Sequence, residues 1–247
     1  RRATRHGRRG GEHGQTGGDL AKQISEGLYR KAVGVTINGE IKDLFAPLTD
    51  GDKVKILTAD DPQSIELLRH STAHVMAQAV QKLFPQAKIA IGPNIDNGFF
   101  YDFEIKDHAL TQDDLSAIEG EMKKIAEAKQ RLVRYDIPDV DVQLKEFESQ
   151  GEKFKAELLN EHRDHNPTLY LMQDKDGKTV WNDLCRGPHL PSTGLIKAYK
   201  LLKTSGSYWR GDEKKEHLQR IYATALWSKK DLDDYLHKLD YAENRDH

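Results

Sequence analysis

Two four-residue spacings, far apart in the chain, constrain its fold most strongly: His-Ser-Thr-Ala-His at 70–74 and Cys-Arg-Gly-Pro-His at 185–189. The first lies in the apolar-periodic stretch 65–80, which predicts a helix on which residues i and i+4 share one face. The second predicts a tight loop, because a Gly-Pro pair follows the strand-like segment 180–184. A fold that joins the two motifs brings three imidazoles and one thiol into one pocket.

Such a set of side chains can hold a metal ion, polarise a water molecule or activate a nucleophile. The structural alternative is a chance pair of histidines on a helix and a cysteine that is simply a small buried apolar residue. The Arg-Gly-Pro sequence after Cys185, the only cysteine of the chain, has no evident use in a plain core. The combination therefore favours a functional site.

The composition excludes several classes of protein. At 247 residues the chain exceeds the usual size of one domain, so we expect two. No apolar run is long enough to cross a membrane, and no apolar segment follows the N-terminal arginines as in a secretory signal. A single cysteine permits no intramolecular disulfide and favours a cytoplasmic location. The net charge is −2, so a polyanionic partner requires a local basic patch.

The pattern of residues predicts an α+β protein. The segment 1–18 is rich in Arg and Gly and is either an incidental tail or an RNA-binding arm. A helix is expected over 19–33 and a hairpin around the Asn-Gly pair in 35–41. Further helices are expected over 62–84, 113–130, 142–159 and from 228 onward, and strands over 51–58, 88–91, 99–103, 131–137 and within 168–208.

Five motifs in order resemble one known family: those at 69–74, 90–102, 185–189, 203–212 and 218–222. They are similar to the N-terminal half of the bacterial-type threonyl-tRNA synthetase family. The resemblance implies a small β-grasp, ubiquitin-like TGS domain over 19–61, whose opening hairpin is replaced here by the Arg/Gly-rich run. It implies a larger α+β editing domain over 62–226, with an antiparallel sheet and a long helix, and the start of a linker helix over 227–247.

The family must reject serine, which lacks only one methyl group of threonine, and a missing methyl is worth only about 1–3 kcal/mol in a binding pocket. The resemblance therefore implies hydrolysis of mischarged Ser-tRNA(Thr) by water-mediated ester cleavage, while the full enzyme ligates threonine to tRNA(Thr) with ATP. The implied catalytic residues are His70, His74, Cys185, His189 and Lys155. The implied substrate-binding residues are Tyr101, for the seryl hydroxyl, and Asp183, for the amino group.

No cofactor is expected in this region, since the family is described as editing without a metal. If zinc is bound, its ligands are His70, His74, Cys185 and His189. ATP, magnesium and a further zinc ion are expected only in the catalytic domain, which this sequence lacks.

The expected partners are the acceptor end of tRNA(Thr) and its seryl ester, with no membrane. A basic and aromatic surface for the single-stranded acceptor end is expected at Lys197, Lys200, Lys203, Tyr208, Trp209 and Arg210, with Tyr199, Lys214 and Lys215 nearby. The alternatives are a solvated strand face and, for Trp209, a core anchor. We expect this chain to be a monomer and the full enzyme a homodimer.

Three other functions remain open from the sequence. The chain could be a free-standing zinc-dependent alanyl-tRNA deacylase, although its small N-terminal domain argues against this. It could be a non-catalytic RNA-binding module in which the ubiquitin-like domain carries the function. It could also be a structural zinc module, in which case removal of the metal should unfold it.

Overall fold

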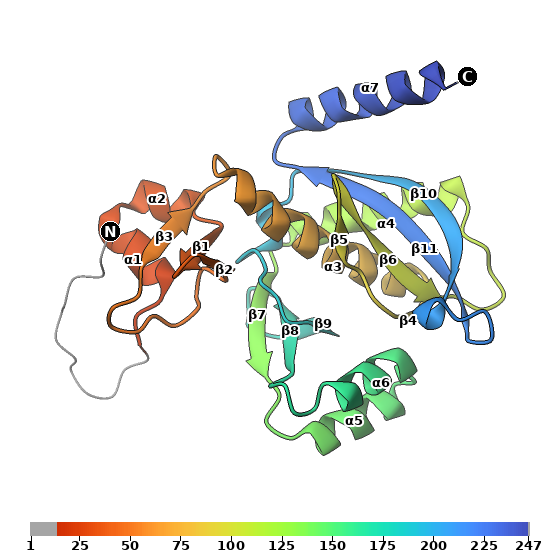
Figure 1. Cartoon of the computed structure of the whole chain (residues 1–247), viewed down its shortest axis with the longest axis horizontal. Helices are drawn as coiled ribbons and strands as arrows, with labels where there is room; N and C mark the ends of the chain where they lie inside the picture. Colours follow the sequence, from red (N-terminus) through yellow and green to blue (C-terminus); the bar gives the residue numbers. More distant parts are fainter. Residues whose placement is uncertain (1–13, 247) are drawn as a thin grey trace.

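The computed structural model describes residues 14–246 and confirms the α+β class. Figure 1 shows a small N-terminal unit beside a larger one, with the long helix α3 between them. We define the N-terminal unit as residues 14–61. The Arg/Gly-rich segment predicted over 1–18 lies outside the described residues as far as residue 13.

Helices and strands alternate irregularly along the described residues, with the following bounds. The helices are α1 (Gly17–Ile24), α2 (Glu26–Lys31), α3 (Ile65–Leu83), α4 (Gln112–Glu127), α5 (Val140–Ser149), α6 (Lys153–Glu161) and α7 (Lys229–Arg245). The strands are β1 (Gly34–Ile37), β2 (Glu40–Lys42), β3 (Val54–Leu57), β4 (Lys88–Ile89), β5 (Asn94–Ile95), β6 (Gly98–Glu104), β7 (Arg131–Asp136), β8 (Thr168–Gln173), β9 (Thr179–Leu184), β10 (Ala198–Tyr208) and β11 (His217–Leu226). Short 3-10 turns occupy Pro62–Ser64, Thr193–Leu195 and Trp209–Gly211.

The N-terminal unit is a three-stranded antiparallel sheet in the order β2-β1-β3, packed against α1 and α2. The helix predicted over 19–33 is two helices, because Ser25 is extended and its side chain caps α2 by accepting from the Leu28 amide. The predicted hairpin is confirmed: Asn38 and Gly39, at φ of 53° and 87°, join β1 to β2.

The main core lies between α3, α4 and a five-stranded antiparallel sheet. The sheet order is β10-β11-β6-β4, with β5 paired to β6. Helix α3 is buried over most of its length, since it contacts β6 and β11 on one side and α4 on another. This burial explains why small residues such as Ala73 and Ala77 lie along it, because they allow neighbouring elements to approach closely.

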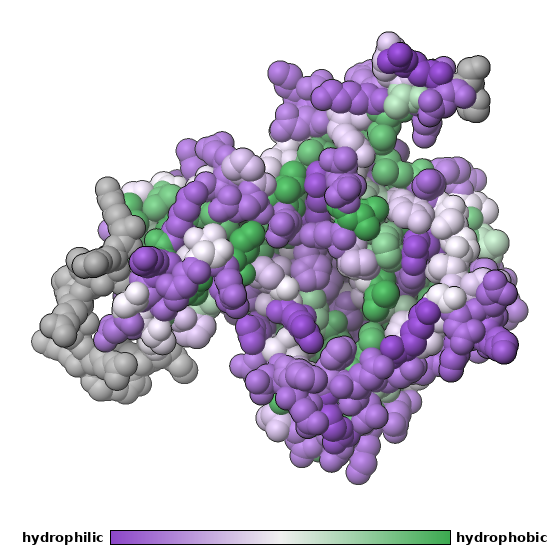
Figure 2. Space-filling model, viewed as in Figure 1, coloured by the Kyte–Doolittle hydropathy of each residue, from purple (hydrophilic) through white to green (hydrophobic). Residues whose placement is uncertain are grey.

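A second antiparallel sheet, β7-β8-β9, carries the helix pair α5 and α6. Gly151, at φ of +70°, separates the two helices in the segment that the sequence predicts to be mostly helical. In the view of Figure 2 the surface of this pair and of α7 is largely hydrophilic. None of the helices within residues 14–246 is long and apolar enough to span a lipid bilayer.

Candidate functional site

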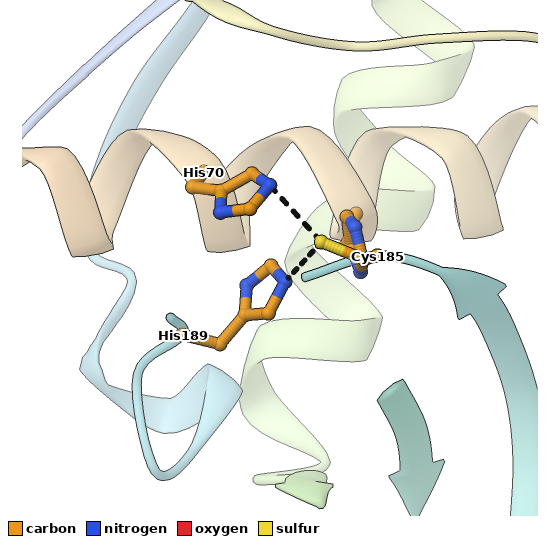
Figure 3. Close-up of side chains that lie close together, drawn as sticks. His70, Cys185 and His189 are labelled. Carbon is orange, nitrogen blue, oxygen red and sulfur yellow. Dashed lines mark hydrogen bonds between the residues drawn. The ribbon is translucent and has the colours of Figure 1, made fainter. Parts of the chain in front are cut away.

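The two motifs meet in the structure. His70 extends from α3 towards the loop that follows β9, which carries Cys185 and His189 (Figure 3). His74 lies one turn further along α3, and its ring centroid is 4.2 Å from that of His189. The Cys185 Sγ lies 3.3 Å from the Nε2 of His70 and 3.3 Å from the Nε2 of His189. One donor atom from each of the four side chains lies within 4.8 Å of the others. The structure therefore confirms that the four residues form one cluster.

Hydrogen-bond partners fix the proton positions around the thiol. The Nδ1 of His70 lies 3.1 Å from the Pro188 carbonyl oxygen, which can only accept, so His70 carries its proton on Nδ1. Its Nε2 is then a free base facing Cys185. Burial raises the pKa of the Cys185 thiol, so the sulfur keeps its proton and donates it towards His70.

His189 is oriented by Ser71, a residue between the two helix histidines that the sequence analysis missed. The Ser71 Oγ accepts from the Leu190 amide at 2.9 Å, which leaves its own proton for the Nδ1 of His189 at 3.0 Å. His189 therefore carries its proton on Nε2 and donates to the Cys185 sulfur. The signal available in the sequence was a small hydroxyl on the same helix as the histidine pair.

The imidazoles of the cluster are neutral near pH 7. Burial lowers the pKa of His70, although its hydrogen bond to Pro188 opposes the effect. Burial also lowers the pKa values of His74 and His189 well below the usual range, and the neighbouring imidazoles add to this lowering. Neutral imidazole is the form that accepts a proton or binds a metal ion.

A buried acidic group lies behind the cluster. Asp183 is 3% exposed and accepts a hydrogen bond from the Tyr101 hydroxyl, and its carboxylate lies 3.7 Å from the Lys155 Nζ and 3.4 Å from the Nε2 of His74. Burial raises the pKa of Asp183, and the Lys155 ammonium acts against this rise. Three residues that the family resemblance places near the substrate thus form one network that reaches the cluster through His74.

The loop that carries Cys185 is held by Gly187, which the sequence predicts, and by Thr168 and Asp43, which have no sequence signal. The Thr168 hydroxyl donates to the Cys185 carbonyl oxygen, and the Gly187 amide donates to Sγ at 3.2 Å. Gly187 has φ of +74°, and a Cβ there would overlap the Tyr170 hydroxyl, so only glycine fits this turn. Asp43 of the N-terminal unit accepts hydrogen bonds from the loop and from Tyr170.

The four side chains of the cluster could hold a metal ion. Their nitrogen and sulfur donors suit tetrahedral zinc, and the 3.3 Å separations between Sγ and the two imidazole nitrogens are close to those between ligands of such an ion. The Nδ1 of His74 is buried and has no hydrogen-bond partner within residues 14–246. A metal ion or a water molecule would satisfy it.

The residues predicted to bind tRNA lie along β10 and the turn after it. Lys197, Lys200, Lys203, Tyr208 and Arg210 are exposed, as are the neighbouring Lys214 and Lys215. Two of these cations are already paired with carboxylates: Lys200 with Glu119 at 3.3 Å and Arg210 with Glu161 at 3.0 Å. Hydrogen bonding from Tyr199 to a backbone carbonyl keeps its ring half-buried against α4.

Trp209 is not available for stacking on a base, which corrects that part of the prediction. Its side chain is 3% exposed, packs against Phe154 and donates from Nε1 to Glu157 at 2.9 Å. The ring is an anchor of the small core between α6 and the sheet. Its size and its polar edge explain this role, because a buried indole needs one hydrogen-bond acceptor.

Comparisons with known proteins give the family context. Residues 3–58 match the TGS domain, and residues 168–222 match the Threonyl and Alanyl tRNA synthetase second additional domain. The second match includes Cys185 and His189. A threonine–tRNA ligase of Citrifermentans bemidjiense is 45% identical over 229 residues, which is 93% of this chain and 35% of the relative. Corresponding ligases of Paramagnetospirillum magneticum and Clostridium tetani are 48% and 45% identical, over 96% of this chain and 36% of each relative.

The chain spans about a third of the length of the curated relatives that it matches, with 35% of the first of them covered. Within that span the two matched domains occur in the order TGS and then second additional domain. The chain corresponds in sequence to the N-terminal TGS and editing-domain region of bacterial threonyl-tRNA synthetases.

Proposed function

We propose that the cluster of His70, His74, Cys185 and His189 hydrolyses the ester bond of mischarged Ser-tRNA(Thr). The observation that carries this proposal is the meeting of three neutral imidazoles and a thiol beside a buried carboxylate, in a chain whose matched domains include the second additional domain. Ester hydrolysis needs a positioned water and a group that moves its proton, and both needs fit neutral imidazole near pH 7.

In the proposed reaction a water molecule adds to the seryl carbonyl carbon. The Nε2 of His70, unprotonated because Nδ1 bonds to Pro188, accepts a proton from that water, which replaces the Cys185 thiol as the hydrogen-bond donor to Nε2. The bond between the carbonyl carbon and the ribose oxygen then breaks, and the proton passes to the leaving ribose hydroxyl. The products are free serine and uncharged tRNA, so atoms and charge balance.

Cys185 and His189 are proposed to keep the wall of the site in place. The thiol is protonated and bonded to two imidazoles, so its role is to orient them rather than to attack the ester. The raised pKa supports this choice, because only a thiolate is a good nucleophile.

Asp183 is proposed to attract the seryl ammonium group, and Tyr101 to meet the seryl hydroxyl. Asp183 is a carboxyl group beside the cluster; burial raises its pKa, and the Lys155 ammonium on the other side opposes that rise. The pocket then accepts serine and excludes threonine, which is larger by one methyl group. This second selection is needed because a binding pocket alone discriminates only weakly against the loss of one methyl group.

The acceptor end of tRNA(Thr) is proposed to reach the site along the exposed cations of β10. Lys197 and Lys203 are exposed, and the Nζ of Lys203 lies 5.1 Å from the centre of the Tyr222 ring. Replacing both lysines with alanine should weaken tRNA binding and reduce the salt dependence of the binding constant by about two phosphate contacts.

The central experiment compares the hydrolysis of Ser-tRNA(Thr), Thr-tRNA(Thr) and Ser-tRNA(Ala). We expect loss of serine from tRNA(Thr), sparing of threonine, and collapse of the rate in His70→Ala and Cys185→Ala. His237→Ala, which changes an exposed histidine on α7, is the matched control and should keep the full rate. Preferred turnover of Ser-tRNA(Ala) would instead indicate an alanyl-tRNA deacylase, and tRNA binding without hydrolysis a non-catalytic module.

The reaction is proposed to need no metal, although the donor set would accept zinc. If zinc binds, the four cluster residues would hold it and it would supply a more acidic water. Full hydrolysis after exhaustive chelation, with metal analysis showing less than one equivalent of zinc, is the expected result. Loss of hydrolysis on chelation and recovery with zinc would overturn this point.

The wider protein is proposed to be a cytoplasmic threonine–tRNA ligase. Formation of threonyl-tRNA(Thr) with ATP and assembly into a homodimer are proposed for the whole protein, since this chain spans only about a third of its relatives. The prediction that this chain alone is a monomer is tested by sedimentation at several protein concentrations.

A further inference from the structure

One carboxylate of the N-terminal unit reaches the wall of the candidate site. Asp43 directly follows β2, and its Oδ1 accepts a hydrogen bond from the backbone amide of His189 at 2.6 Å. Its Oδ2 accepts from the Tyr170 hydroxyl at 2.5 Å. Burial raises the pKa of Asp43, while both hydrogen bonds stabilise its ionised form. A single side chain is thus bonded to the site loop and to the strand beneath it.

Both hydrogen bonds of Asp43 act on His189: one holds its backbone amide, and the other holds Tyr170, whose ring contacts the His189 ring. The Tyr170 ring packs edge-on against the His189 ring, with 4.4 Å between centroids. The His189 ring in turn stacks on His70 at 4.2 Å and donates to the Cys185 sulfur. A displacement of the Asp43 carboxylate would therefore move the loop backbone and one wall of the imidazole cluster together.

One side of the loop borders a cavity, so packing does not hold the loop there. A cavity of about 840 Å³ lies at the junction of the two units, and its lining includes Asp43, Tyr170 and residues 186–191. Within residues 14–246, and apart from the connecting segment 58–64, the hydrogen bonds between the N-terminal unit and the rest of the chain all end on Asp43. Apolar packing also joins the units, since Val33 and Leu57 belong to the main core and Ile41 packs against it.

We propose that Asp43 is a positioning residue of the deacylation site, so that the N-terminal unit sets the geometry of the His189 loop. The inference rests on the proposed function for its effect on activity. Its structural part, the placement of His189 by a carboxylate of the other unit, can be measured without any substrate.

The test uses the whole chain with Asp43→Ala and Asp43→Asn. Asp52→Ala is the matched control, because Asp52 is also a hydrogen-bonded carboxylate of the N-terminal unit and accepts from Thr49 and Asn38, away from the loop. The first readout is the backbone amide and imidazole resonances of His189. A hydrogen bond to a carboxylate is stronger than one to a neutral acceptor. The amide proton should move upfield strongly in Asp43→Ala, slightly in Asp43→Asn, and not in Asp52→Ala.

The second readout is steady-state hydrolysis of Ser-tRNA(Thr). Asp43→Ala should lower kcat by about 10- to 100-fold, the scale expected for a misplaced catalytic wall, with little change in KM. Asp43→Asn should recover most of kcat, because its amide oxygen can still accept from the His189 amide. If the lower kcat of Asp43→Ala came only from poorer folding, Asp43→Asn would not restore it, and Asp52→Ala would show the same loss.

The outcomes separate this inference from the proposed function. Unchanged His189 resonances in both Asp43 variants overturn the inference, whatever the activity. If the His189 resonances shift in the Asp43 variants but the wild-type chain never hydrolyses Ser-tRNA(Thr), the placement is supported and the proposed function is overturned. If Asp43→Ala does not fold, the His189 amide shift in Asp43→Asn decides the matter by the same criterion.

Discussion

The buried pair of Lys155 and Asp183 gives the sharpest prediction about stability. The two side chains are 5% and 4% exposed, and their charged atoms lie 3.7 Å apart. At an effective dielectric constant of about 20, unit charges at this distance attract by about 4 kcal/mol. Asp183→Asn removes that attraction and leaves the Lys155 ammonium buried without a counter-charge. We expect a loss of about 3–5 kcal/mol in the free energy of unfolding.

The magnitude can be measured by urea unfolding at pH 7.5, followed by tryptophan fluorescence. Trp181, Trp209 and Trp227 all lie outside the N-terminal unit, so the signal reports the part of the chain that holds the pair. Adding Lys155→Met to Asp183→Asn removes the stranded charge and should recover stability, giving a coupling free energy of about 2 kcal/mol or more.

Asp136→Asn is the control for that experiment, because it breaks a pair with Arg134 in which the side chains are 81% and 49% exposed. An exposed pair contributes about 0–1 kcal/mol, so this variant should unfold almost as the wild type does. A cost below about 1 kcal/mol for Asp183→Asn, with additive effects in the double variant, would refute the reasoning that the pair is desolvated and mutually dependent.

Three further predictions concern the cluster imidazoles, the turn at Gly187 and the N-terminus of α4. The three cluster imidazoles have lowered pKa values in the folded chain, so the unfolded chain binds more protons below pH 6.5. The free energy of unfolding should therefore fall as the pH drops from 6.5, by at most about 4 kcal/mol per pH unit. An unchanged urea midpoint between pH 7.5 and 5.5, measured in the presence of a chelator, would contradict this. Gly187→Ala should lower the melting temperature and slow deacylation, by forcing a side chain into a left-handed turn against Tyr170; a wild-type melting curve would argue against this. Thr111→Ala should cost about 1 kcal/mol by removing the capping box of α4, and calorimetry should show Thr111→Ser to be nearly neutral.

Local sequence chemistry predicts much of this fold. The Asn-Gly pair at 38–39 predicts the β1–β2 turn, because both residues can adopt positive φ. Ser228 predicts the start of α7, where its hydroxyl accepts from the Asp231 amide. The break at Ser25 was missed, because a residue that caps one helix looks much like a polar position within a longer one.

The site is predictable only in part from the sequence. The His-x-x-x-His and Cys-x-x-x-His spacings identify the four cluster residues, since each spacing reports a local structure. Asp43 and Tyr170 carry no such signal, because they meet through tertiary packing of segments far apart in the chain. Trp209 was placed on a basic surface by its neighbours in sequence, whereas its apolar area is buried against α6.

The burial of α3 has a consequence for motion. Its residues from Ser71 to Ala77 are buried, and they include His74. Amides at the centre of such a core exchange with solvent mainly when the whole unit unfolds, so they should be among the slowest to exchange in the molecule. The helix that carries the histidines then has no low-energy route to open locally. Adaptation to an incoming ester must come from the loop at 185–189 and its neighbours, while the helix acts as the fixed reference.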